Sequence, residues 1–290
     1  MMISILDNTV HVAKALLPAN PSATTLPNIL SILTGFICHS SDDEALADEH
    51  MARREWSQAA NIFACIINPN VRVLNKYGCL LREHLNNLSG ALECHQQALL
   101  KATDREQAET LICLGLVHKG MKQHAEALKV YSQALQWFEN ETKRDPVMIA
   151  RCLIGIGNAQ WARQQLTEAL DYTERALAIR EHEIKPKNDF DIAACLGNMS
   201  NILHDQGDIK RALSCATRAV DLLSACGKDD PRLAAALNNL GAFHIANGDL
   251  VKAREHFERA LESISNENHP HRKSTLANLA RLETMEKSKK

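Results

Sequence analysis

The chain has 290 residues, with 33 basic and 35 acidic side chains, so its formal net charge is −2. This near balance excludes a protein that binds nucleic acid or an anionic membrane through its overall charge. Aromatic residues make up only 4% of the sequence. Alanine and leucine dominate the apolar set, which favours closely packed helices over strands rich in β-branched and aromatic residues.

The first 41 residues form a separate segment, in which two short apolar stretches are broken by Pro18, Pro21 and Pro27. We interpret it as a helical or irregular element: a docking helix pair, a cap or the remnant of another domain. Its apolar run from Ile29 to Cys38 is shorter than the ~20 residues that cross a bilayer. It has no basic start like that of a secretory signal, so we expect a cytoplasmic protein without membrane insertion.

Nine cysteines are scattered along the chain without a CxxC pair. An odd, dispersed set favours free thiols in a reducing compartment over a disulfide framework. We expect most of these cysteines to fill small apolar positions on helix faces.

From residue 74 onward the chain repeats one pattern, in which Leu-x-x-apolar-small is followed 12 or 13 residues later by an alanine. The small residues of its five copies are Gly78, Gly115, Gly157, Ser200 and Gly241. The alanines that follow are separated by 36, 42, 43 and 41 residues and are Ala91, Ala127, Ala169, Ala212 and Ala253. A fixed period of this length is the mark of a repeat architecture.

Each copy has the periodicity of two helices. Leu237, Leu240 and Gly241 lie on one face of a first helix, and Ala253 and Phe257 lie on one face of a second. The small residues allow the two helices to approach closely, and a Gly-Asp turn supplies the left-handed residue that reverses the chain. Because one such hairpin cannot bury its own apolar face, neighbouring hairpins must stack.

Helix starts are marked by residues that suit the first turn. Asp145 and Asp230 each stand before a proline at the start of an apolar helix, and His269 also precedes a proline. Asn188 has the same position before the helix that contains Leu196. Aspartate and asparagine are good N-caps, and proline is tolerated at the first helical position because its missing N–H needs no partner there.

The pattern Leu-Gly, then Ala, then Phe or Tyr, then Ala resembles the tetratricopeptide repeat. The period of about 42 residues exceeds that repeat's usual ~34, and the segment from Gly227 to Leu240 is similar to the kinesin light chain subclass. The resemblance covers roughly Asp42 to Leu282. It implies an all-α fold, a right-handed α-α superhelix (a tetratricopeptide solenoid) of about six helix hairpins with a C-terminal capping helix. A HEAT-type solenoid is the alternative, but the Gly-Asp turns and the alanine pattern favour the first interpretation.

We therefore divide the chain into the N-terminal segment 1–41, a repeat array over 42–285 and a polar tail over 286–290. The hairpins are expected over 42–69, 72–104, 108–141, 147–184, 190–226 and 231–267, followed by the capping helix over 271–285.

In the family that the chain resembles, the first helices of the hairpins line a concave groove that binds peptides. Residues offset from the leucine face of these helices form one stripe, spaced i, i+3, i+4, i+7 and i+10. The candidate peptide-binding residues are Arg72, Lys76, Arg82, Lys119, Arg151, Asn158, Trp161, Asn198, Asn201, His204, Asn238 and Asn239.

The stripe changes character along the chain. Its N-terminal half is basic, which predicts an acidic partner, and its C-terminal half is rich in asparagine. Asn198, Asn239 and Asn278 fall at one equivalent position, and an amide can both donate to and accept from a peptide backbone. Trp161 would anchor an apolar side chain. The alternatives are an ordinary solvated face for the polar residues and packing between repeats for Trp161.

No motif points to catalysis. The chain has neither GxxxxGK[ST] nor GxGxxG, and His269 and His271 have no third metal ligand near them in sequence. We expect no catalytic residue, metal or cofactor. The predicted function is a scaffold or adaptor, monomeric or weakly self-associating, that binds an extended acidic peptide and no nucleic acid. The alternatives are the regulatory or substrate-recruiting part of a larger enzyme or signalling protein, and a self-associating structural array.

Overall fold

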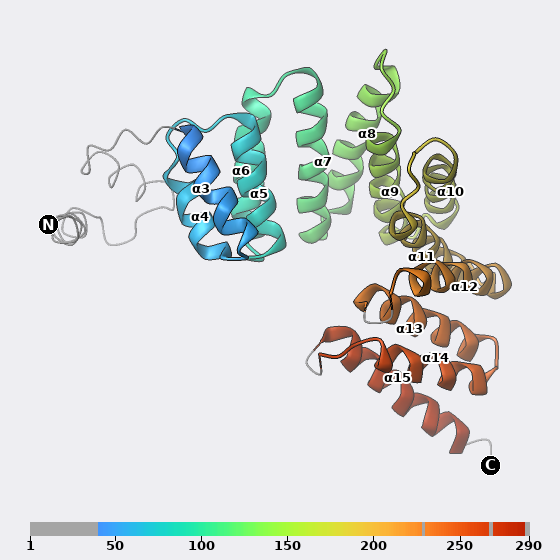
Figure 1. The fold of residues 1–290 in the computed structure, drawn as a ribbon. Helices are drawn as coiled ribbons and strands as arrows, with labels where there is room; N and C mark the ends of the chain where they lie inside the picture. Colours follow the sequence, from blue (N-terminus) through green and yellow to red (C-terminus); the bar gives the residue numbers. More distant parts are fainter. Residues whose placement is uncertain (1–39, 228–229, 267–268, 288–290) are drawn as a thin grey trace, which may run out of the picture. The chain divides into compact units, whose positions relative to one another are not determined.

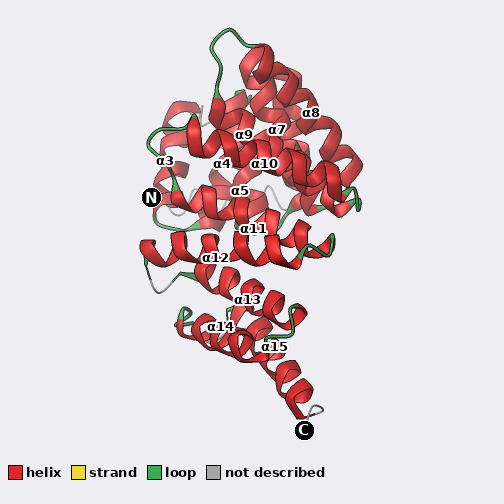
Figure 2. Cartoon of the chain, turned by 90° about the vertical axis from the view of Figure 1, so that its right-hand side faces the viewer, coloured by secondary structure: helices red, strands yellow, loops and turns green. Residues whose placement is uncertain are grey.

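A computed structural model describes residues 40–227, 230–266 and 269–287. The predicted N-terminal segment lies outside this part of the chain except for its last two residues, as does the end of the predicted polar tail. The described residues form thirteen helices and no strand (Figures 1 and 2). Their bounds are α3 Ser40–Ala52, α4 Trp56–Cys65, α5 Val71–Glu83, α6 Leu88–Lys101, α7 Asp104–Gly120, α8 His124–Asn140, α9 Pro146–Ala162, α10 Leu166–His182, α11 Asp189–Asp205, α12 Ile209–Cys226, α13 Pro231–Ala246, α14 Leu250–Glu262 and α15 Pro270–Lys287.

The chain divides into two compact units, unit 1 up to Met121 and unit 2 from Lys122 onward. In unit 1, α3 packs on α4 and α5 on α6, α4 packs on α5, and α7 packs against both α6 and α5. This division falls within the hairpin predicted over 108–141. The predicted domain boundaries remain a prediction.

In unit 2, the hairpins α9–α10, α11–α12 and α13–α14 stack in chain order (Figure 1). Helix α8 packs against α9 at one end of this stack, and α15 packs against α14 and α13 at the other. The first helices also contact one another, α9 with α11, α11 with α13, and α13 with α15. For the described residues, the prediction of an all-α fold of stacked helix hairpins is confirmed.

The N-caps form as the sequence predicted. The Asp145 carboxylate accepts hydrogen bonds from the backbone N–H groups of Val147 and Met148, both at 3.1 Å, and Pro146 follows as the first residue of α9. Asp230 accepts in the same way from the N–H of Arg232 at 2.8 Å. Each cap satisfies a backbone donor that has no partner within its helix.

The turns inside the hairpins require a residue with positive φ. Gly207 and Gly248 take φ of +83°, as predicted for the Gly-Asp turns of unit 2. In unit 1 the corresponding turns use Arg54, with φ of +60°, and Asn86, with φ of +50°. Glycine adopts this conformation without the steric cost that a Cβ atom brings.

The small residues Gly78, Gly157 and Gly241 are needed for close packing within their hairpins. A Cβ atom on Gly241 would lie 2.6 Å from Cε1 of Phe257, and one on Gly157 would lie 2.7 Å from the hydroxyl of Thr173. The two helices of a hairpin can therefore meet only if these positions stay small. Within the described residues, no helix combines the length and apolar character that crossing a membrane would require.

Candidate functional site

The first helices of unit 2 carry the predicted C-terminal half of the stripe. Asn158 and Trp161 come from α9, His204 from α11, and the asparagine row, which we define as Asn198, Asn201, Asn238 and Asn239, from α11 and α13. All seven side chains are half-buried. This exposure suits residues that pack against neighbouring helices and still present polar atoms to a ligand.

The amides of the first helices are joined to one another. Asn239 Nδ2 donates to Asn201 Oδ1 at 3.4 Å, which links α13 to α11. Asn278 Nδ2 donates to Asn238 Oδ1 at 2.9 Å, which links α15 to α13. An amide offers two donor hydrogens and two acceptor lone pairs, so each of these side chains keeps capacity for a ligand. The amides thus have a packing role that the sequence analysis did not assign to them.

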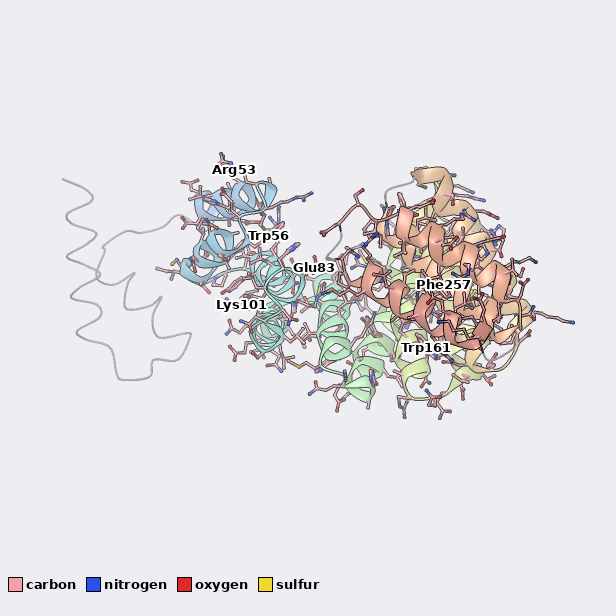
Figure 3. The ribbon with its side chains drawn as sticks, turned by 90° about the horizontal axis from the view of Figure 1, so that it is seen from below. Arg53, Trp56, Glu83, Lys101, Trp161 and Phe257 are labelled. Atoms are coloured by element: carbon pink, nitrogen blue, oxygen red, sulfur yellow. The ribbon has the colours of Figure 1, made fainter. Side chains whose placement is uncertain are left out.

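Trp161 also connects two repeats. Its indole Nε1 on α9 donates to Oδ2 of Asp205 on α11 at 2.7 Å (Figure 3 labels Trp161). Asp205 lies in addition 3.4 Å from Nδ1 of His204, whose ring centroid is 5.0 Å from that of Phe243. The indole nitrogen therefore supports the packing interpretation of Trp161, and the half-buried ring remains available as an apolar surface.

In unit 1 the basic residues of the stripe lie beside acids. The Lys76 ammonium is 2.8 Å from Glu44 and 2.6 Å from Asp48, and Arg72 is 3.2 Å from Glu44. Glu44 and Asp48 belong to α3, which the stripe did not include. Arg82 pairs with its neighbour Glu83.

The basic character predicted for this half is therefore largely neutralised within unit 1. The two other basic members, Lys119 on α7 and Arg151 on α9, are exposed, and no ion pair joins either of them to a carboxylate in the described part of the chain.

A depression of about 460 Å³ lies between α3, α5 and α7 in unit 1. Its walls carry charges of both signs, so it suits a mixed polar ligand better than a purely acidic one. Its lining residues are Met51, Val71, Arg72, Asn75, Lys76, Cys79, Glu106 and Glu109.

Beside this depression, three residues from three helices of unit 1 come together. A ring nitrogen of His95 on α6 and the Sγ atoms of Cys79 on α5 and Cys113 on α7 all lie within 4.8 Å of one another. His95 is fully buried, and its Nδ1 is 2.8 Å from Oδ1 of Asn75. The Asn75 amide nitrogen donates to the Thr110 hydroxyl at 2.8 Å.

The cysteines of the chain differ in acidity. A hydrogen bond with Cys113, together with His95 and Arg82 nearby, lowers the pKa of Cys79 to about 4 against the opposing effect of burial. Burial instead raises the pKa of Cys94 and Cys152 to about 12. Cys79 is therefore the more acidic of these thiols, and the thiolate is the form of cysteine that binds metals.

The sequence analysis missed this cluster, since it expected most of the cysteines to fill packing positions. Cys79 and Cys113 lie on the stripe of successive first helices, and this was a usable signal because first helices of adjacent hairpins contact one another. His95, four residues after Ala91, occupies the repeat position that Phe257 holds after Ala253. A histidine at a core position of the second helix was the other signal.

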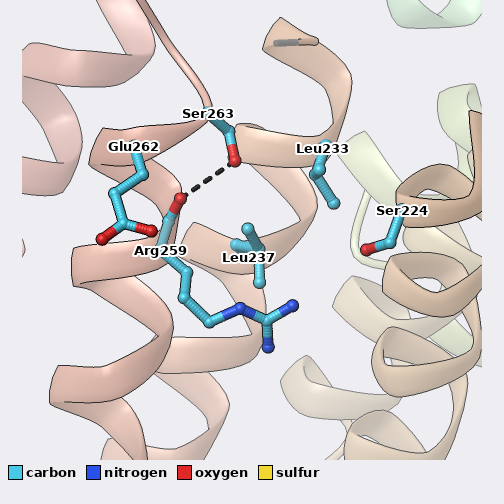
Figure 4. A pocket seen from close by; sticks show the side chains of 6 residues that line it. All are labelled: Ser224, Leu233, Leu237, Arg259, Glu262 and Ser263. Carbon is cyan, nitrogen blue, oxygen red and sulfur yellow. Dashed lines mark hydrogen bonds between the residues drawn. The ribbon is translucent and has the colours of Figure 1, made fainter. Parts of the chain in front are cut away.

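A separate depression of about 350 Å³ lies between α12, α13 and α14 in unit 2 (Figure 4). The hydroxyl of Ser263 donates to the backbone oxygen of Arg259 at 2.9 Å. The lining contains neither cysteine nor histidine, and we assign no chemistry to it. Its residues are Ser224, Leu233, Leu237, Arg259, Glu262 and Ser263.

Comparison with known proteins agrees with this architecture. Two family models described as tetratricopeptide repeat match the chain, one over residues 106–182 and 232–290 and the other over residues 192–232. Together they cover more than half of its length.

Solved structures share the fold. The apo form of RapI has a TM-score of 0.62 at 17% identity, covering 86% of this chain and 72% of that chain. A putative kinesin light chain from Podosopora anserina with nearly identical TPR-like repeats has a TM-score of 0.55 at 16% identity, covering 67% of this chain and 95% of that chain. At these identities the likeness concerns the fold alone, and it agrees with kinesin-light-chain-like repeats.

A curated relative is the human protein O-mannosyl-transferase TMTC1, 26% identical over 236 residues, which cover 71% of this chain and 24% of that protein. The chain thus spans about a quarter of the length of this relative.

Proposed function

Because the chain belongs to the tetratricopeptide repeat family, we propose that it is a noncatalytic scaffold whose asparagine row binds an extended peptide of a partner protein. Tetratricopeptide arrays are in general protein-interaction scaffolds that use extended concave surfaces. The observation that carries the proposal is the set of half-buried amides on the successive first helices α11 and α13.

The chemistry of the row matches a peptide backbone. An extended peptide presents N–H and C=O groups that no helix or sheet of its own satisfies, and an amide side chain can pair with either. The bond between Asn239 and Asn201 and that between Asn278 and Asn238 hold these side chains in place before any ligand arrives. Side chains that are already ordered lose less conformational entropy on binding.

The preference for an acidic peptide with an apolar anchor is the finer part of the proposal. In unit 2 it is supported by the exposed guanidinium of Arg151 and by the half-buried ring of Trp161, both on α9. In unit 1 the pairing of Lys76 with Glu44 and Asp48 reduces the basic character of the stripe, so the support for an acidic ligand comes from unit 2. Charges at the rim of a site alter mainly the association rate and its salt dependence.

The test is a peptide-display selection on the intact chain, followed by affinity measurement for the selected peptides. We expect Asn201→Ala/Asn239→Ala to weaken binding by about tenfold, since each lost hydrogen bond contributes about 0.5–1.5 kcal/mol. The double variant removes both amides of this hydrogen-bonded pair, so no amide is left in place without its partner. Gln136→Ala, which removes an exposed amide from α8, is the matched control. Unchanged affinity in the double variant, with an unchanged melting curve, would refute the asparagine row as the site.

A second candidate is the repeat-containing part of a larger enzyme or signalling protein. It is favoured by the length comparison, because the chain covers only 24% of the curated relative. Mass spectrometry of the endogenous protein distinguishes the two, because additional domains would appear as peptides beyond the 290 residues. A self-associating array is tested separately by size-exclusion chromatography with light scattering.

A further inference from the structure

The cluster of Cys79, His95 and Cys113 joins three helices of unit 1 through side chains that are distant in sequence. The ring nitrogen and the two sulfur atoms lie within 4.8 Å of one another. Two thiols and one imidazole, from α5, α7 and α6, are the ligand types that structural and catalytic zinc sites use.

The buried imidazole is the feature that packing does not explain. His95 is fully buried, and its Nε2 has no hydrogen-bond partner within the described residues. A buried polar atom that lacks a hydrogen-bond partner destabilises the folded state. A position that only needed filling could hold an apolar side chain, as Phe257 does opposite Gly241. His95 lies opposite Gly78 in the same way, where a Cβ atom would be 2.6 Å from the imidazole.

Hydrogen bonds fix which nitrogen of His95 carries the proton. The Thr110 hydroxyl donates to the backbone oxygen of Glu106 at 2.7 Å, so its oxygen accepts from the Asn75 amide nitrogen. The Asn75 oxygen then faces Nδ1 of His95 and accepts a hydrogen bond from its N–H. Nε2 is left with a free lone pair. Histidine ligands of metals are usually oriented by such a bond from their other nitrogen.

We propose that Cys79, Cys113 and Nε2 of His95 bind one thiophilic metal ion, Zn²⁺, with the fourth coordination position open to a water molecule. Zn–S bonds of about 2.3 Å in tetrahedral geometry place two sulfur ligands about 3.8 Å apart. The observed separations, up to 4.8 Å, are about 1 Å longer at most. Because Cys79 lines the depression between α3, α5 and α7, water reaches the ion from that side.

The competing explanation is a disulfide between Cys79 and Cys113. It would leave Nε2 of His95 buried without a partner, whereas a metal ion satisfies all three groups. A disulfide would also need neither His95 nor the hydrogen bonds through Asn75 that orient it. The metal is therefore the occupant that accounts for every member of the cluster.

The bound ion would connect the first helices α5 and α7 to the second helix α6. Such a link is absent from the unfolded chain, so metal binding adds directly to the stability of the folded unit. The inference does not depend on the peptide site proposed for unit 2.

The test uses the untagged full-length chain, purified under reducing conditions and loaded with Zn²⁺. We expect about one zinc per chain by elemental analysis, and a thiolate-to-metal absorption band when Co²⁺ replaces Zn²⁺. Cys79→Ser, Cys113→Ser and His95→Phe should each lose the stoichiometric metal and the Zn²⁺-dependent rise in melting temperature. His95→Phe should still fold, because phenylalanine occupies the equivalent position at Phe257. Cys94→Ala removes the neighbouring buried thiol outside the cluster and should keep the metal.

The possible outcomes distinguish a metal site from the alternatives. Loss of metal in the three cluster variants and its retention in Cys94→Ala support the site. A chain that binds no Zn²⁺ or Co²⁺ under reducing conditions overturns it, as does equal binding by wild type and all three cluster variants. A Cys79–Cys113 disulfide that persists under mild reduction, detected by thiol counting and peptide mapping, overturns it in favour of the crosslink.

Discussion

The same three repeat positions hold different chemistry in the two units. Cys79 and Asn201 each follow the small residue of a first helix, and Cys113 and Asn239 each precede the next small residue by two positions. Between them, His95 in unit 1 corresponds to Ala216 in unit 2, four residues after the repeat alanine. In unit 1 these positions bring two sulfur atoms and an imidazole within 4.8 Å, and in unit 2 they bring two amides to 3.4 Å.

The difference shows that the repeat backbone determines which positions come into contact, and that the residues at those positions determine the chemistry of the contact. Ala216 is buried and apolar, so the second helix adds no polar atom to the amide pair. His95 is buried and polar, so unit 1 needs Asn75 and Thr110 to satisfy its Nδ1. A solenoid can thus carry unlike sites on one backbone pattern without changing its fold.

The largest effect is expected where the two helices of a hairpin meet. Gly241→Leu should lower the free energy of unfolding of unit 2 by about 1–3 kcal/mol, because its side chain would overlap Phe257. Chemical denaturation followed by circular dichroism measures this. Gly197→Ala is the control, since a Cβ atom there meets nothing within 4 Å. If both variants unfold at the same denaturant concentration, the close-packed position has been misidentified.

A smaller loss of stability is expected from removing the hydrogen bond between Trp161 and Asp205, which links α9 to α11. Trp161→Phe keeps most of the ring but removes the hydrogen bond to Asp205, and should reduce stability by about 0.5–1.5 kcal/mol. Asp205→Asn retains an acceptor oxygen for the indole N–H and should lose less stability than Trp161→Phe. Thermal melts of the two variants test this order. An unchanged melting temperature in Trp161→Phe would mean that the ring alone carries the contact between these helices.

Substitutions at the turn residues with positive φ should change the stability of the two units in opposite directions. Gly248→Ala should destabilise unit 2 by about 1 kcal/mol, because alanine is strained at φ of +83°. Arg54→Gly should stabilise unit 1 by a few tenths of a kcal/mol, since relief of strain at φ of +60° is partly offset by the greater entropy of the unfolded chain. Paired denaturation curves would show shifts in opposite directions. Shifts in the same direction would contradict the argument from φ.

The smallest effect concerns pH and is confined to unit 2. Burial lowers the pKa of His244 and His256, whose rings stack at 5.1 Å. Asp249, 4.0 Å from His244, opposes the shift, and Lys252 adds to it. Since the unfolded chain binds protons more readily than the folded one, stability should be complete above about pH 6.5 and fall as the pH drops below it.

The variant His256→Phe keeps a stacked ring and should flatten this dependence. Melting temperatures between about pH 7.5 and 5.5 provide the measurement. Equal slopes for wild type and variant would assign the acid sensitivity to other groups.

Much of the fold was accessible from local sequence. Asp145 and Asp230 predicted helix starts because a cap bonds to backbone groups two or three residues away. Gly241 predicted a close contact because the spacing of leucine and alanine defines the buried face of each helix. Of the eight stripe residues in unit 2, seven are half-buried and Arg151 is exposed, and their role in binding a peptide remains a prediction.

The partners of the site residues were decided by tertiary structure. Trp161 bonds to Asp205, 44 residues away, and Lys76 bonds to Glu44 and Asp48, 32 and 28 residues away. The sequence by itself determined the helices, their buried faces and the family, because these depend on spacing within one repeat. Only the stacking of α5, α6 and α7 decided that Cys79, His95 and Cys113 meet. Distances between side chains on different helices depend on how those helices pack, which no periodicity along the chain records.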